Sequence, residues 1–150
     1  MTGFDGRGRD QVREQERLRR QARYRAGLWS EVAAEALLRL KGYRILGRRF
    51  RTPVGEIDLV GRRGNRLAFV EVKSRPTFEE ALQSVTEEVQ RRVMRAAEWW
   101  MARDPRLARL EPAFDVVLVA AGRLPRHLTD AFDPMRGHGQ AVYASRKGLR

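Results

Sequence analysis

Two carboxylates and an amine are spaced so that they can meet in the stretch GEIDLVGRRGNRLAFVEVK. Asp58 interrupts one apolar run, and Glu71 and Lys73 interrupt the next. If Gly64 and Asn65 form a two-residue hairpin turn, Asp58 lies directly opposite Glu71, and Lys73 shares their face of the sheet. Two like charges in that position destabilise a pair of strands. The pattern therefore indicates that some other group compensates the repulsion.

Three kinds of compensation fit this pair of acids. One carboxyl group can keep its proton through a raised pKa, a nearby Lys or Arg can neutralise the charge, or a divalent cation can bind between the oxygens. Mg²⁺ or Mn²⁺ suits carboxylate ligands, and Lys73 could orient or activate a water molecule beside such an ion. These groups together suit the hydrolysis of a phosphodiester. The alternative is a solvated strand face on which Lys73 and the arginines neutralise the acids.

The elements that would position these residues follow from the hydrophobic pattern. Alternating or continuous apolar runs predict four strands, and apolar residues at three- and four-residue spacing predict two helices. The order αβββαβ indicates an α/β or α+β fold with a mixed sheet. The predicted helices cover residues 29–41 and 78–103; the predicted strands cover residues 43–51, 56–61, 66–74 and 113–121, and an element of unclear type covers 128–132.

The hairpin register also divides the side chains between two faces. With the turn placed as above, Val60 pairs with Phe69 and Glu56 pairs with Lys73, so these residues share the face of Asp58. The other face is apolar and is expected to enter the core. Its members are Ile57, Leu59, Val70 and Val72.

Charge and composition limit which partners and which cellular compartment the protein can have. The 150 residues carry 31 Lys and Arg against 19 Asp and Glu, a net charge of +12. Such a surface attracts polyanions, and the predominance of Arg favours nucleic acid over an anionic membrane. The absence of cysteine excludes disulfides and thiolate metal sites. No apolar run could cross a bilayer and no signal peptide is apparent, so we expect a cytoplasmic protein without membrane contact.

The chain divides into one domain and two tails. We expect residues 1–26 to form a basic arm that is disordered or a weakly held helix, and residues 134–150 to form a flexible basic tail. Residues 27–133 form the folded domain. The arm could contact phosphates, or it could be a solvated and dispensable tail.

A family resemblance rests on GEIDLV followed by FVEVKSR, after EVAAEALLRLKGYRIL. This pattern looks like the signature of the PD-(D/E)XK restriction-endonuclease-like superfamily. The chain more closely resembles the uncharacterised bacterial YraN-like proteins, which are similar in pattern to archaeal Holliday-junction resolvases. The resemblance covers residues 29–132. It implies an α/β fold with a restriction-endonuclease-like αβββαβ core, in which helices flank a mixed sheet.

The resemblance also implies roles for individual residues. Asp58 and Glu71 would hold Mg²⁺ or Mn²⁺, Lys73 would position or activate the water, Glu31 would be an outer or second metal ligand, and Glu56 would be an accessory acid. The implied reaction is hydrolysis of DNA, including branched or recombining DNA. By analogy with resolvase-like relatives, a homodimer is an option. The candidate nucleic-acid contacts lie on the long helix, at Arg91, Arg92 and Arg95.

Three positions depart from the family pattern. Ser30 stands where Gly is usual, Val89 stands where a Lys is usual, and Ala113 stands where an Arg is usual. The loss of the Lys removes a candidate phosphate-binding group. These departures keep open a second reading, a nucleic-acid-binding module that retains the nuclease fold without cleaving. A third reading is a partner-binding protein that uses Trp99 and the basic tails.

The remaining polar candidates have simpler interpretations. His127 and His138 lack metal-ligand spacing, so we expect both to be ordinary surface residues. Asp115 lies in an apolar strand, where a buried salt bridge is the expected role.

Overall fold

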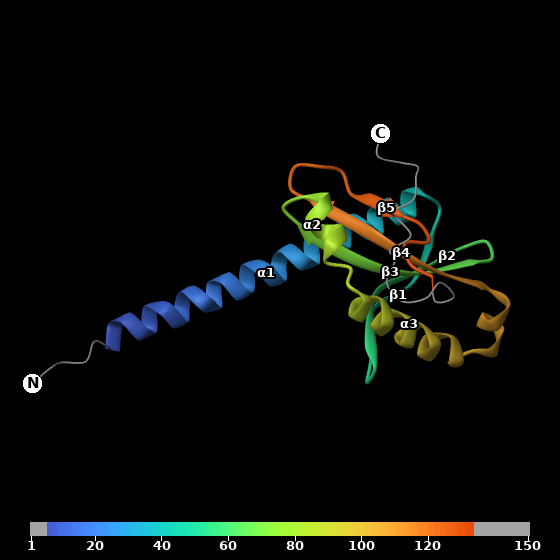
Figure 1. The fold of residues 1–150 in the computed structure, drawn as a ribbon, viewed down its shortest axis with the longest axis horizontal. Helices are drawn as coiled ribbons and strands as arrows, with labels where there is room; N and C mark the ends of the chain where they lie inside the picture. The colour runs from blue at the N-terminus through green and yellow to red at the C-terminus, as the bar shows by residue number, and fades with distance from the viewer. Residues whose placement is uncertain (1–5, 134–150) are drawn as a thin grey trace, which may run out of the picture.

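A computed structural model of the chain describes residues 6–133. A long helix, α1 (Gly6–Leu40), precedes three strands, β1 (Arg44–Thr52), β2 (Gly55–Arg63) and β3 (Arg66–Arg75). The helices α2 (Phe78–Gln83) and α3 (Glu87–Ala102) follow, and then the 3₁₀ helix η1 (Pro105–Arg109) and the strands β4 (Glu111–Ala120) and β5 (Arg126–Leu128) (Figure 1). Among these elements no helix has the length and apolar character needed to cross a bilayer.

The five strands form one mixed sheet in the order β1-β2-β3-β4-β5. Strands β3 and β4 are parallel, and the other neighbouring pairs are antiparallel. The parallel pair requires a crossover, which α2, α3 and η1 supply. The expected α/β fold, a mixed sheet flanked by helices, is therefore confirmed.

Helices cover both faces of the sheet. On one face Ala34 and Leu38 of α1 pack in a buried cluster with Val70 and Val117. On the other face the residues of α2 and α3 pack around Phe69 in a larger cluster. Because neighbouring residues of β3 enter both clusters, this strand is apolar on both sides, as central strands are. The polar residues near its end, Glu71 and Lys73, depart from that pattern.

The predicted hairpin register is confirmed where the two strands pair. Val60 lies opposite Phe69 and Arg63 lies opposite Arg66, around a turn in which Gly64 has a φ of 61°. The described pairing ends at Leu59 and Val70. The β2–β3 ladder therefore stops just before the acidic residues.

One of the four residues predicted to share a core face lies on the opposite side of the sheet. Leu59, Val70 and Val72 lie on the α1 side of the sheet, as expected, but Ile57 packs in the cluster on the α3 side. The side-chain alternation of β2 is thus interrupted at Asp58. On the neighbouring strand, Arg49 has a φ of 47°. A non-glycine residue in that conformation marks a local departure from extended backbone.

The two predicted helices also need correction. The first begins at Gly6, so residues 6–26, expected as a disordered arm or weakly held helix, belong to α1. Helix formation there needs no new nucleus, because the packed segment after Ser30 already provides one and Arg, Gln and Glu favour propagation. The predicted helix 78–103 is divided in two, because the Thr86 side chain accepts a hydrogen bond from the Val89 amide and caps α3. The expected basic tail, residues 134–150, lies outside the described residues.

Candidate active site

A polar cleft of about 280 Å³ opens between the β2–β3 hairpin and α3. Its acidic and basic lining comes from both strands and from one helix residue, Arg92. The structure thus brings together four of the residues selected from the sequence. They are Glu56, Asp58, Glu71 and Lys73. The remaining lining residues are Val72, Val89 and Val93.

Asp58 is held at the point where the regular ladder stops. The Val72 amide donates a hydrogen bond of 2.7 Å to its Oδ2 atom, so that the side chain continues the link between β2 and β3. Burial and the neighbouring Glu71 charge raise the pKa of Asp58 to about 7, against the lowering effect of the Val72 amide. The fold therefore keeps a carboxyl group where its ionised form is unfavourable.

Glu71 is more deeply buried, with 9% of its surface exposed. Its Oε1 atom lies 2.9 Å from Nζ of Lys73, two residues along the same face of β3. Burial raises the pKa of Glu71, although the Lys73 ammonium opposes that shift. One lysine is therefore not enough to offset the cost of burying two acids.

Backbone packing fixes the distance between the strands and α3. A Cβ atom added to Gly55, at the start of β2, would overlap the carbonyl oxygen of Arg92. The absence of a side chain at Gly55 thus lets α3 approach the hairpin and close one side of the cleft. Across the cleft, the Arg92 charge lowers the pKa of Glu71.

The two further acids differ in their surroundings. Glu56 lines the cleft, lies 3.5 Å from Arg51, and its charge raises the pKa of Glu71. Glu31 is not among the lining residues. It accepts hydrogen bonds of 2.6 and 3.2 Å from Nε and Nη2 of Arg49, and its charge raises the pKa of Asp58. Glu31 thus acts on the cleft from beside it. No pattern in the sequence indicated this partner, because Arg49 lies on a different element, eighteen residues further along the chain.

The three arginines proposed as nucleic-acid contacts are all exposed on α3. Arg92 lines the cleft, whereas Arg91 lies 4.0 Å from Glu87 one turn earlier on the helix. Arg95 is not among the residues that line the cleft. Of the three, Arg92 is therefore best placed to meet a substrate in the cleft.

A divalent cation fits the donor chemistry of the cleft. Two carboxyl groups with raised pKa values lie there together, and a bound dication would stabilise both as anions. Within residues 6–133 no three His, Cys, Asp or Glu side chains are gathered in a complete metal centre. Mg²⁺ does not require one, since it commonly takes one or two carboxylates and completes its shell with water and substrate phosphates.

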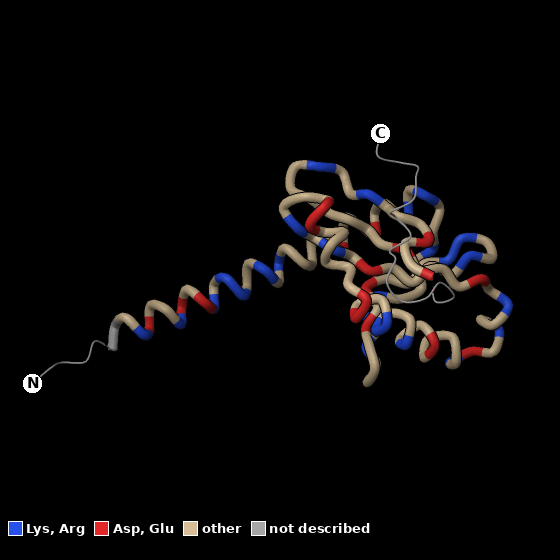
Figure 2. Tube along the Cα trace, in the orientation of Figure 1, with Lys and Arg blue, Asp and Glu red and all other residues tan. Residues whose placement is uncertain are grey.

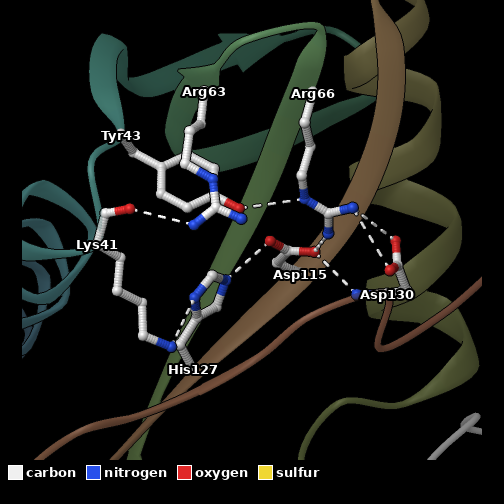
Figure 3. A network of polar contacts seen from close by, with 7 residues as sticks. All are labelled: Lys41, Tyr43, Arg63, Arg66, Asp115, His127 and Asp130. Atoms are coloured by element: carbon white, nitrogen blue, oxygen red, sulfur yellow. Dashed lines mark hydrogen bonds and ion pairs between the residues drawn. The ribbon is translucent and has the colours of Figure 1, made fainter.

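Asp115 belongs to a separate polar network, drawn in Figure 3. It is fully buried and lies 2.6 Å from Arg66 and 2.8 Å from Nε2 of His127. The Asp130 amide donates a third hydrogen bond to it. The expected buried salt bridge is thus confirmed, and the network ties β3, β4 and β5 together.

The prediction of a surface position for His127 is wrong. Its side chain is 1% exposed, with Nδ1 lying 3.3 Å from Nζ of Lys41 and the ring edge against Tyr43. A histidine in a three-residue strand carries no periodic signal, so its partners could not be read from the sequence. His138 lies outside the described residues.

Comparison with known proteins places these features in a family. The model described as "Uncharacterised protein family UPF0102" matches residues 30–119. A UPF0102 protein of Rhodopseudomonas palustris (strain BisB18) is 53% identical over 114 residues, which cover 76% of this chain and 84% of the relative. A UPF0102 protein of Nitrobacter winogradskyi is 52% identical over 114 residues, 76% of this chain and 97% of the relative. A third, from Chelativorans sp. (strain BNC1), is 50% identical over 116 residues, 77% and 94% of the two chains.

Proposed function

The chain belongs to the uncharacterised protein family UPF0102, and we propose that it is a metal-dependent nuclease that hydrolyses DNA phosphodiesters. The observation that carries the proposal is the cleft in which Asp58 and Glu71, both with a raised pKa, lie beside Lys73. Perturbed carboxyl groups gathered in a cleft are a feature of functional sites. The net charge of +12 favours a polyanionic substrate. The resemblance to PD-(D/E)XK nucleases, which use the same residue types in the same order, agrees with this reading.

Each charged residue of the cleft, and Glu31 beside it, has a part in the proposed reaction. Asp58 and Glu71 would hold Mg²⁺ or Mn²⁺, with Glu31 as an outer acid and Glu56 as an accessory one. When bound, the ion supplies Lewis-acid polarisation of the phosphate and makes water a better nucleophile. Lys73, 2.9 Å from Glu71, would orient the attacking water and offset negative charge developing on the phosphate. Arg92, an exposed residue that lines the cleft, would bind a neighbouring phosphate.

A direct test uses the purified chain with Mg²⁺ or Mn²⁺ on supercoiled plasmid, single-stranded DNA and four-way junctions. Glu71→Gln and Asp58→Asn should each lower the cleavage rate about 100-fold or more, because each removes a ligand charge. Glu98→Gln is the matched control, since it removes one exposed acid from α3 outside the cleft. Cleavage that persists unchanged in Glu71→Gln and Asp58→Asn would refute the assignment.

One observation favours a second candidate, a DNA-binding module without activity. Val89, which stands where the resemblance leads one to expect a Lys, lines the cleft with an apolar side chain. This alternative predicts salt-dependent DNA binding with no cleavage of any of the three substrates. Val89→Lys then separates the two readings. A gain of cleavage in that variant alone would show that the fold is competent and that the natural chain lacks one cation.

A further inference from the structure

The first part of α1 projects away from the domain (Figure 1). It precedes the family match, which begins at residue 30. Between residues 8 and 25 it carries seven arginines against three acids, and the side chains are exposed from Arg9 to Arg25. Figure 2 shows these basic positions in blue along the projecting helix. The projecting section is therefore a basic helix attached to the domain, and we call it the arm.

Four of its residues form one stripe along the helix. Arg13, Arg17, Arg20 and Tyr24 follow one another at spacings of four, three and four, which places them on the same face. Glu31 follows Arg13 by eighteen residues, which is about five turns, so the stripe points at Glu31. We call these four residues the basic stripe.

Contacts connect the end of the basic stripe to the cleft. The guanidinium of Arg49 lies 5.7 Å from the centre of the Tyr24 ring and forms the two hydrogen bonds to Glu31. The charge of Glu31 in turn raises the pKa of Asp58. The basic stripe thus leads along α1 to the flank of the proposed catalytic acids.

The positions of the apolar residues on the arm do not fit binding to a membrane or to a partner helix. The large exposed hydrophobic residues on it are Val12, Leu18 and Tyr24. Each is six residues from the next, a rotation of about 120° around the helix. An interfacial helix or a coiled-coil helix needs its apolar residues on one face. From residue 8 to residue 25 the helix has no such face, whereas its charge is complementary to phosphate.

We propose that the basic stripe binds the phosphate backbone of double-stranded DNA and guides the duplex to the cleft. This inference rests on the proposed function, because it names the substrate of the same site. From Arg13 to Glu31 the helix spans about 27 Å, the length of about eight base pairs. Arginine guanidinium groups at helical spacing provide contacts to phosphates that are independent of base sequence.

The test compares two double variants of the full chain with equal charge and equal spacing. Arg13→Gln with Arg17→Gln alters the stripe, whereas Arg19→Gln with Arg23→Gln alters a face turned away by about 120°. Binding to a fluorescent duplex of about 25 base pairs is measured by anisotropy in EDTA over a salt series. The stripe variant should bind about tenfold more weakly near 0.15 M salt, and its log–log salt slope should fall by about 2. The control pair should change affinity less than about twofold.

Three outcomes would refute DNA binding by the basic stripe. The two double variants could lose DNA affinity equally, or the stripe variant could bind DNA like the wild type. The stripe variant could also lose binding to phosphatidylserine vesicles while it keeps its affinity for DNA. Circular dichroism of both variants checks that the helix is retained. EDTA prevents metal-dependent cleavage, so the binding result stands apart from the proposed activity. Weaker DNA binding by the stripe variant, together with no cleavage by the wild type in Mg²⁺, would refute only the proposed nuclease activity. Cleavage by the wild type, together with unchanged DNA binding by the stripe variant, would refute only DNA binding by the basic stripe.

Discussion

The carboxyl group of Asp58 accepts a hydrogen bond from the Val72 amide, while burial and the Glu71 charge raise its pKa to about 7. In the unfolded chain the same group would titrate near the ordinary aspartate pKa of 3.8. Between these two values the folded protein binds a proton that the unfolded chain does not. The free energy of unfolding therefore falls as the pH rises through this window.

Asp58→Asn removes this titration and keeps an oxygen that can accept the Val72 hydrogen bond. We expect the variant to be more stable than the wild type at pH 8, by about 1–3 kcal/mol, because a buried charge is lost. At pH 5 the wild-type residue is already protonated, and the difference should nearly vanish. Urea denaturation of both proteins at the two pH values measures this. A difference of the same size at pH 5 and pH 8 would contradict it.

Divalent cations should act through the same two acids. If Asp58 and Glu71 hold Mg²⁺ or Mn²⁺, millimolar ion should raise the melting temperature of the wild type at pH 8 by a few degrees, because the ion binds only the folded state. The effect should be smaller at pH 5.5, where protons compete for the carboxyl groups. Asp58→Asn should show little effect at either pH, and Glu98→Gln should behave as the wild type. Calorimetric titration with Mn²⁺ provides an independent measurement.

At the scale of elements, the cleft depends on how closely α3 approaches the β2–β3 hairpin. Gly55→Ala should lower the free energy of unfolding by about 1–3 kcal/mol, because its methyl group must displace the Arg92 carbonyl. Gly27→Ala is the contrasting substitution, since nothing lies within 4 Å of the added atom and the position is helical. It should be neutral or stabilising by up to about 1 kcal/mol. Chemical denaturation measures the free energy of unfolding of the two variants. Equal values would contradict the expected overlap between the added methyl group and the Arg92 carbonyl.

Strands β1 to β4 were predictable because each carries its own signal, whereas the three residues of β5 are too few to show one. The Gly64-Asn65 turn and the apolar runs on either side set the register that places Val60 opposite Phe69. The paired ladder ends at Leu59 and Val70, and beyond it the hydrogen bond from the Val72 amide holds Asp58 beside the strand that carries Glu71. The break in alternation at Ile57 had no such signal. It reflects local geometry near Arg49, whose φ of 47° no propensity scale would anticipate.

Residues whose surroundings come from distant segments were the least predictable. Glu31 contacts Arg49 across eighteen residues of chain, and the Asp115 network joins residues from β3, β4 and β5. The His127 side chain is buried where the sheet places Asp115 beside it and Tyr43 packs against its ring. Asp115 itself was predictable in role, because a carboxylate in an apolar strand needs a partner. The identity of that partner required the fold.

At the scale of the whole molecule, the arm and the domain should be separable. Side chains between Arg9 and Ala26 are exposed, and Tyr24 is the residue of this stretch that contacts Arg49 of the domain, at the surface. Few of the contacts that stabilise the domain thus involve the arm. The domain packs its own two buried clusters around the sheet, and α1 enters them only from Ala34 onward.

Removal of residues 1–23 should therefore leave the melting temperature within about 2 °C of the wild type, since exposed positions contribute little to stability. The far-ultraviolet helical signal should fall by the share that residues 6–23 contribute, because they are helical in the full chain. Affinity for duplex DNA should fall at least as far as in the Arg13→Gln, Arg17→Gln variant, while thermal stabilisation by Mn²⁺ should persist. A large loss of stability would mean that the arm packs against the domain, and DNA binding equal to the wild type would place the main phosphate contacts on the domain itself.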